Sequence, residues 1–159
     1  MTELKRGWTT GTCAAAAAKS ACSALLSGQF LNPVTITLPK GESPSFDVIN
    51  LDQGEGWAKA SIIKDAGDDP DVTHGALVMA RVRCLPESAG IVFKAGVGVG
   101  TVTKAGLPIP PGEAAINPVP RKMMSEIVAT LCSEHAITPD IEIEISIENG
   151  AELALHSNE

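Results

Sequence analysis

With 159 residues and a mass of 16.4 kDa, the chain has the size of one domain that buries a core of its own. Its hydrophobic content of 44% argues against disorder, and no apolar run approaches the roughly 18 residues of a membrane span. A net charge of −7, few aromatic residues and no Lys/Arg run disfavour nucleic-acid binding, so a small-molecule ligand is expected.

The first predicted element is a helix that begins at Thr10 or Thr12 and ends at Ser27. A threonine cap precedes an alanine run of high helix propensity, and Gly28 supplies the C-terminal stop. Alternation of apolar residues predicts a strand over 33–39. Weaker or shorter strands follow in chain order at 45–51, 57–63 and 76–84, and the segments 90–96 and 99–104 are either short strands or loop arms around a glycine cluster.

Residues 104–120 carry five of the eleven prolines, which predicts a long, stiffened loop rather than regular structure. A second helix is expected from Pro120 to Ala136, with one buried face at helical spacing formed by Met124, Ile127, Val128 and Leu131. Strict alternation of isoleucine and glutamate predicts a half-buried strand over 140–149. These elements predict one α+β domain over residues 1–159, with a mixed or antiparallel sheet packed against two main helices.

The four cysteines form no CxxC pair and do not cluster with the three histidines. We therefore expect reduced, buried thiols and no metal site. A helix start lowers the pKa of a nearby thiol such as Cys13, but the alanine-rich flank favours a buried structural role. No secretory signal pattern is visible, and the expected location is the cytoplasm.

The segment KDAGDDPDVTHGA, from Lys64 to Ala76, holds four aspartates within seven residues. A calcium loop of the EF-hand type that starts at Asp65 is excluded. Gly67 and Ala76 stand at positions 3 and 12, which need oxygen ligands, and Pro70 stands at position 6, which needs glycine. Two interpretations stay open: a solvated turn whose carboxylates bond nearby backbone N–H groups, or the rim of a site with Lys64 as counter-ion.

A glycine cluster at Gly96, Gly98 and Gly100 resembles half of a dinucleotide-binding fingerprint, but the following residues are proline-rich rather than helical. The glycines then indicate close backbone approach, either to another strand or to the carboxylates of a ligand. Four cations bracket this cluster and the stiff loop, and with the N–H groups at the first helix start they fit a polyanion site. These cations are Lys94, Lys104, Arg121 and Lys122, and Arg121 is the preferred bidentate carboxylate binder.

Three longer motifs occur in the order RGWTTGTCAAAAAK (6–19), KDAGDDPDVTHGA (64–76) and GVGTVTKAGLPIPPGEAAINPVPR (98–121). Together they cover much of the chain and closely resemble the CbiD family, the cobalt-precorrin-5B C(1)-methyltransferases of anaerobic cobalamin synthesis. Two positions depart from the family pattern: Val97 stands where a glutamate is usual, and Ala105 where a proline is usual.

The resemblance implies S-adenosyl-L-methionine as methyl donor and a ring-contracted tetrapyrrole as acceptor, with cobalt only as part of that substrate. The methyl group would pass to C-1 of the macrocycle and give cobalt-precorrin-6A. The resemblance also implies a second, Rossmann-like α/β domain after the strand at 140–149, so the chain corresponds to the N-terminal domain alone. That missing domain and a second copy of the chain are the expected protein partners.

From the motifs and side-chain chemistry we assign a catalytic or polar rim to Asp65, Asp68, Asp69 and Asp71. The substrate- and cofactor-binding surface is assigned to Thr9, Thr10, Thr12, Lys64, Gly98, Gly100, Lys104, Asn117 and Arg121. The alternative is a non-catalytic module that binds an anion or tetrapyrrole, or another subunit.

Overall fold

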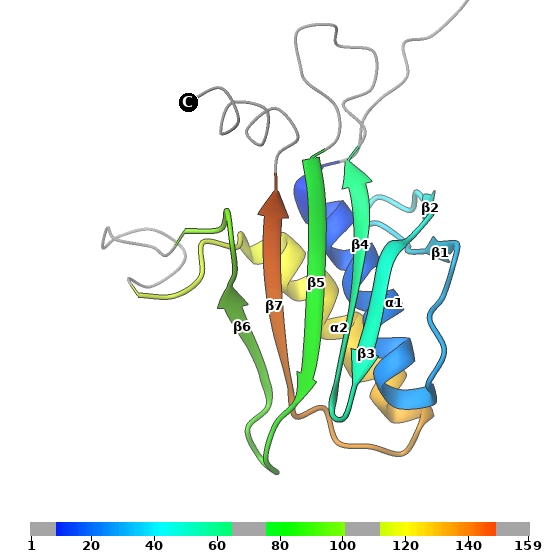
Figure 1. Ribbon diagram of the computed structural model, residues 1–159, viewed down its shortest axis with the longest axis vertical. Coiled ribbons are helices and arrows are strands. Elements are labelled where there is room, and N and C mark those ends of the chain that lie inside the picture. The colour runs from blue at the N-terminus through cyan, green and yellow to red at the C-terminus, as the bar shows by residue number, and fades with distance from the viewer. Residues whose placement is uncertain (1–8, 65–75, 101–111, 149–159) are drawn as a thin grey trace, which may run out of the picture.

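The computed structural model describes residues 9–64, 76–100 and 112–148, which form two layers: a sheet, and two helices that cover one of its faces (Figure 1). The five-stranded sheet has the order β3-β4-β5-β7-β6, and every neighbouring pair is antiparallel except β6 and β7. Its strands are β3 (Ile49–Gly54), β4 (Trp57–Lys64), β5 (Ala76–Cys84), β6 (Ile91–Ala95) and β7 (Ile141–Glu148). The predicted α+β class with a mixed sheet is confirmed.

Helix α1 (Thr10–Ser27) follows the prediction at both ends. Thr9 Oγ1 accepts a hydrogen bond from the Thr12 N–H at 3.1 Å, and Gly28 takes the left-handed conformation that ends the helix. The alanines between these ends are buried, because their small side chains let the helix lie close to both the sheet and α2 (Pro118–Glu134). Among the described helices, none is both long and apolar enough to cross a membrane.

The strand predicted at 33–39 is largely wrong, and the strand predicted at 45–51 forms in two pieces. Only β1 (Val34–Thr35) and β2 (Ser45–Phe46) form there as a short antiparallel pair, and β3 begins separately at Ile49. Prolines at 33, 39 and 44 lack the N–H group that a ladder needs, which limits the extension of this pair. The apolar alternation nevertheless reports burial, since Val34 and Ile36 both lie in the core.

Helix α2 begins two residues earlier than predicted, at Pro118, which suits the first helical position because its missing N–H needs no partner there. Met124 and Val128 are fully buried, as predicted. Ile127 and Leu131 pack against the core but are only partly buried, so that part of the predicted face is confirmed only in part. Met123 and Cys132 are buried in their place, and the two displaced residues line a groove described below.

Strand β7 is central in the sheet, between β5 and β6. Its isoleucines at 141, 143 and 145 face the helices and are buried. Its glutamates face the opposite, open side of the sheet, where Glu142 and Glu144 pair with Arg83 and Arg81 of β5. The prediction of a half-buried strand is confirmed.

Candidate functional site

The ends of several motif-bearing elements meet at one end of the molecule. Strand β4 ends at Lys64, which pairs with Ala76 at the start of β5, and Leu77 next to it pairs with Glu148 at the end of β7. The start of α1 lies at this end too, because the charge of Lys64 acts on Cys13 in its first turn (Figure 1). The acidic motif therefore leaves and re-enters the sheet beside the first helix start.

The two helices begin side by side. A Cβ at Gly11 would lie 3.0 Å from Pro120, tighter than an ordinary contact, so glycine eases this close approach of α1 to α2. A pocket of about 360 Å³ opens between the two starts, and its lining comprises Thr9, Gly11, Thr12, Leu38, Pro39, Lys40, Glu42, Val119, Pro120 and Met123. Neither helix has an acidic residue in its first turn, so no carboxylate there offsets the partial positive charge of the helix N-terminus.

Two of the three predicted threonines, Thr9 and Thr12, line this pocket. The Thr9 hydroxyl donates to Thr12 Oγ1 at 2.9 Å and accepts from the Thr12 N–H, so the two side chains lock each other at the helix start. Thr12 is buried, Thr10 is half-buried, and Thr9 is exposed at the mouth. Asn117 occupies the corresponding cap position of α2, but its exposed side chain makes no capping hydrogen bond, which leaves its amide group open to a ligand.

The glycine cluster lies against β7. Val97 O accepts from the Ile147 N–H at 2.7 Å, and a Cβ at Gly98, whose φ is +78°, would collide with Ile147 O. A Cβ at Gly96 would likewise collide with Ser146. Close approach to another strand is therefore confirmed for these two glycines. Gly100 is different, because no atom of the described residues lies within 4 Å of its Cβ position.

The guanidinium group of Arg121 donates hydrogen bonds to the chain segment before α2. Its Nε donates to Ile116 O at 2.7 Å and its Nη2 donates to Ala114 O at 2.6 Å. Its Nη1 lies 3.4 Å from Glu113 Oε1, and the guanidinium stacks over the Phe93 ring at 5.1 Å. These contacts fix the entry to α2, and the proposed role in binding carboxylates stays a prediction.

A hydrogen bond joins the glycine cluster to the helix starts. Gly100 O accepts from the Ala115 N–H at 2.8 Å, and Ala115 belongs to the segment that Arg121 holds in place. Hydrogen bonds and close contacts thus link the glycine cluster beside β7, the segment before α2 and the start of α1. Lys94 lies on β6 and lines a further pocket together with Arg121, whereas Lys122 lines the groove outside the helices.

Three of the cysteines are buried as expected, but Cys84 is exposed at the end of β5, so the prediction is wrong there. Burial raises the pKa of the Cys13 thiol to about 11, although the positive charge of Lys64 acts in the opposite direction. A neutral, buried thiol is a poor nucleophile, which supports the structural role for Cys13. Within the described ranges, no group of three or more His, Cys, Asp or Glu residues is arranged to hold a metal ion.

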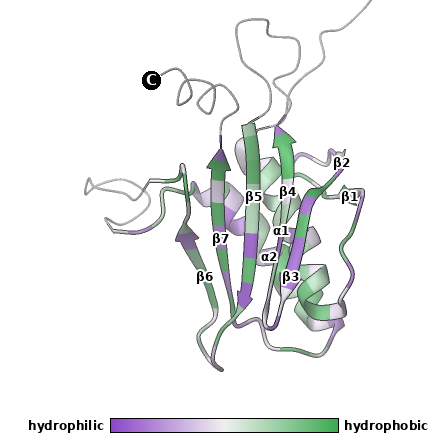
Figure 2. Ribbon diagram, viewed as in Figure 1, coloured by the Kyte–Doolittle hydropathy of each residue, from purple (hydrophilic) through white to green (hydrophobic). Residues whose placement is uncertain are grey.

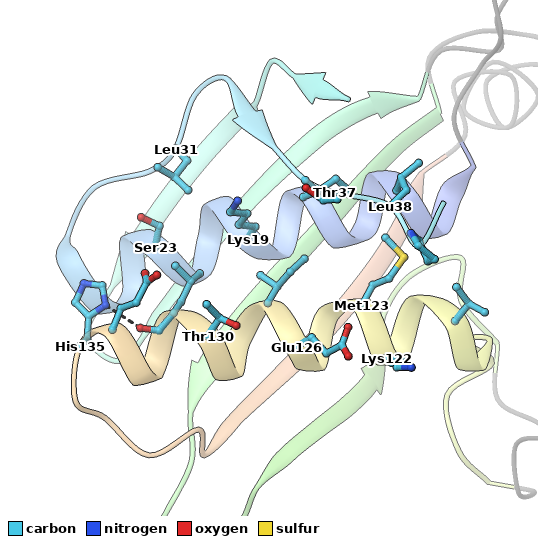
Figure 3. A pocket seen from close by; sticks show the side chains of 16 residues that line it. Lys19, Ser23, Leu31, Thr37, Leu38, Lys122, Met123, Glu126, Thr130 and His135 are labelled. Atoms are coloured by element: carbon cyan, nitrogen blue, oxygen red, sulfur yellow. Dashed lines mark hydrogen bonds between the residues drawn. The ribbon is translucent and has the colours of Figure 1, made fainter. Parts of the chain in front are cut away.

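The sequence interpretation missed a groove of about 1000 Å³ that runs along the outer side of α1 and α2 (Figure 3). Its apolar lining includes Leu31, Leu38, Met123, Ile127 and Leu131, and Lys19 and Glu126 lie at its rim. The groove shares Leu38 and Met123 with the pocket at the helix starts, so the two adjoin. Two of its residues belonged to the predicted buried face of α2, and only the packing showed them to be left partly uncovered.

Asp65, Asp68, Asp69, Asp71 and Lys104 lie outside the described residues. Of the acidic motif, the structure places only Lys64 and Ala76, the residues at its two ends.

Comparisons with known proteins agree with the motifs. The family model described as CbiD matches residues 1–158. Proteins named cobalt-precorrin-5B C(1)-methyltransferase are 58% identical over 152 residues in Brucella ovis and 55% identical over 154 residues in Paramagnetospirillum magneticum. The chain is covered to 96% and 97% in these matches, but it spans only 41% and 43% of the relatives' own length.

A solved structure is also similar. The crystal structure of the cobalamin biosynthesis protein CbiD from Archaeoglobus fulgidus matches with a TM-score of 0.62 and 29% sequence identity. The match covers 97% of this chain and 47% of that protein. Motifs, family model, relatives and fold agree over nearly the whole chain, which therefore belongs to the CbiD family.

Proposed function

We propose that the chain forms part of an S-adenosyl-L-methionine-dependent methyltransferase that converts cobalt-precorrin-5B to cobalt-precorrin-6A by methylation at C-1. The proposal rests on the family membership and on the name shared by the relatives at 55–58% identity. A cytoplasmic location belongs to the same proposal. The structural observation that carries it is the pair of helix starts, which suits an anionic substrate.

The acceptor is a polyanion, because its macrocycle carries acetate and propionate groups. The starts of α1 and α2 present backbone N–H groups toward one pocket, and no acidic residue in either first turn opposes an incoming carboxylate. Lys40 and Glu42 both line that pocket, and Lys64 lies near the same helix start. We assign peripheral carboxylates of the tetrapyrrole to this end, with Thr9 and Asn117 as neutral hydrogen-bonding partners.

The chemistry requires few catalytic groups. The bond between the methyl carbon and the sulfonium sulfur breaks with its electrons remaining on sulfur, while the ring carbon supplies the pair for the new C–C bond. Alignment of donor and acceptor supplies most of the rate advantage for such a step. Proton removal from the conjugated ring is the one step that calls for a base, and we assign it to the aspartates between Lys64 and Ala76.

The test measures binding and methyl transfer separately. Cobalt-precorrin-5B is titrated against the chain, and radiolabelled S-adenosylmethionine is then added to follow methyl incorporation, with the full-length Brucella ovis relative as reference. Binding with methyl incorporation supports the proposal. Binding without incorporation by the chain alone supports the alternative of a tetrapyrrole-binding module, and absence of binding refutes both.

Matched variants locate the site. Lys64→Ala should weaken tetrapyrrole binding by about fivefold, the equivalent of losing roughly 1 kcal/mol of attraction to a partly exposed charge. Lys59→Ala on the same strand, which faces the open side of the sheet, should leave affinity unchanged. Asp69→Asn should lower methyl incorporation more than affinity. Equal effects of the two lysine variants would place the substrate elsewhere.

A further inference from the structure

The open face of the sheet, opposite the helices, has two unlike halves. In the half near the end of β5, Arg83 makes a bidentate pair with Glu142 at 3.0 and 3.2 Å, and Arg81 lies 3.8 Å from Glu144. Arg81 also stacks over the Trp57 ring at 5.0 Å. This half has the character of a solvent-exposed surface, because its charged side chains form ion pairs across the strands.

The other half, near the end of β4 and the start of β5, is apolar on β3, β4 and β5, and Glu148 of β7 borders it. We call it the apolar quadrant, and it comprises Ile49, Ser61, Ile63, Leu77 and Met79. The strand register places these residues on one face, since Ser61 pairs with Ile49 and Met79, and Ile63 pairs with Leu77. Figure 2 shows the contrast along β5, whose purple, hydrophilic segments appear only in its later half.

The apolar quadrant is incompletely covered. Ile63 is 53% exposed and Ile49 is 36% exposed, although both belong to strands of the main sheet. At the centre of the quadrant, Ser61 Oγ is buried and has no hydrogen-bond partner among the described residues. A strand with one solvated face alternates apolar and polar residues, whereas the start of β5 reads Ala-Leu-Val-Met-Ala, the pattern of a strand covered on both faces.

The course of the chain indicates what covers it. Strand β7 ends at Glu148, directly opposite Leu77 in the register, so polypeptide that continues beyond β7 leaves the sheet at the edge of the quadrant. The relatives do continue, because this chain matches 96% of its own length but only 41% of the length of the Brucella ovis protein.

We propose that the apolar quadrant is the docking surface for the part of these relatives that follows the segment matching this chain, called here the C-terminal part. Docking there would bury Ile63 and bring a polar group within reach of Ser61 once the flexible Met79 side chain moves aside. It would also place the C-terminal part next to Lys64 and Ala76, so the substrate site would lie between the two parts. The inference rests on the family relationship and not on methyl transfer.

Thiol labelling tests the proposal directly. In a Cys84→Ser background, which removes the exposed native thiol, Ile63→Cys reports on the apolar quadrant. Val92→Cys is the matched control, because Val92 is 41% exposed on the charged half of the same face, opposite Glu142. Each variant is labelled with a maleimide in the chain alone and in a fusion of residues 1–148 to the C-terminal part from Brucella ovis.

The rate at Ile63→Cys should fall by about tenfold or more in the fusion, since labelling then requires local opening, while Val92→Cys should change by less than about twofold. The intact Brucella ovis protein, with a cysteine at the position aligned with Ile63, must show the same slow rate, and this measurement decides if the fusion misfolds. Fast labelling in the intact protein overturns the proposal. Protection of Ile63→Cys in the chain alone that increases with concentration also overturns it, in favour of a second copy.

Discussion

Replacing Gly98 by alanine separates the role of the glycine cluster in the fold from its role in binding. Gly98 has a φ of +78°, and an added Cβ would meet the Ile147 carbonyl of the central strand β7. The left-handed conformation costs a residue with a Cβ about 1–2 kcal/mol. Crowding against fixed backbone adds about 1–3 kcal/mol. We expect Gly98→Ala to lower the free energy of unfolding by about 3 kcal/mol.

The chain offers a matched control two residues away. Gly100 has no positive φ and, in the part of the chain that the structure describes, no atom within 4 Å of its Cβ position, so Gly100→Ala should leave stability unchanged. For a domain of this size each kcal/mol shifts Tm by about 2–4 °C, which predicts a fall of about 6–12 °C for Gly98→Ala. Thermal unfolding followed by far-UV circular dichroism measures both variants without ligand.

Two outcomes would refute this reasoning. If Gly98→Ala unfolds at the wild-type temperature, the segment after β6 does not depend on its contact with β7. If Gly100→Ala is equally destabilising, open space at its Cβ position is not what distinguishes the two glycines. Should Gly100→Ala weaken tetrapyrrole binding at unchanged stability, the cluster combines both roles assigned to it from the sequence.

Three further predictions concern Arg121, Asp140 and the thiols. Arg121→Ala should cost about 2–3 kcal/mol in urea unfolding, because it removes two charge-assisted bonds to Ile116 O and Ala114 O, whereas Arg121→Lys should recover only part of that loss. The Gly90 N–H and then the Thr138 hydroxyl lower the pKa of Asp140, so its stabilisation is present above the ordinary value of 3.8 and disappears as the pH falls through the lower folded pKa. Asp140→Asn should therefore lower Tm at neutral pH but not in strong acid. Iodoacetamide should modify one thiol, Cys84, in the native chain and all four in denaturant; more than one fast-reacting thiol would contradict the burial of Cys13, Cys22 and Cys132.

Local physics made much of the fold predictable. The start and end of α1 follow from a threonine cap and a glycine stop, which act through neighbouring backbone groups only. The alternation in β7 predicted which of its side chains are buried, because successive side chains of a strand face opposite sides of the sheet. Prediction was poor at β1 and β2, where the apolar alternation correctly indicated burial but the prolines prevented an extended ladder.

The candidate site divides in the same way. The sequence identified Gly98 as a position of close approach but could not decide between a strand and a ligand, since that choice depends on where β7 lies. It named Arg121 as a cation near the proline-rich loop but not the carbonyls that occupy its donors, which come together only when the segment before α2 folds back on the helix.

The residues by themselves determined the types of most elements, the α+β class and the family, because capping, alternation and motif order are properties of the linear chain. Only the tertiary structure decided that two helix starts share one pocket, that Ile127 and Leu131 line a groove, and that the open face of the sheet is half charged and half apolar. These features join residues far apart in sequence, and the register of the strands and the packing of α1 on α2 set which of them meet.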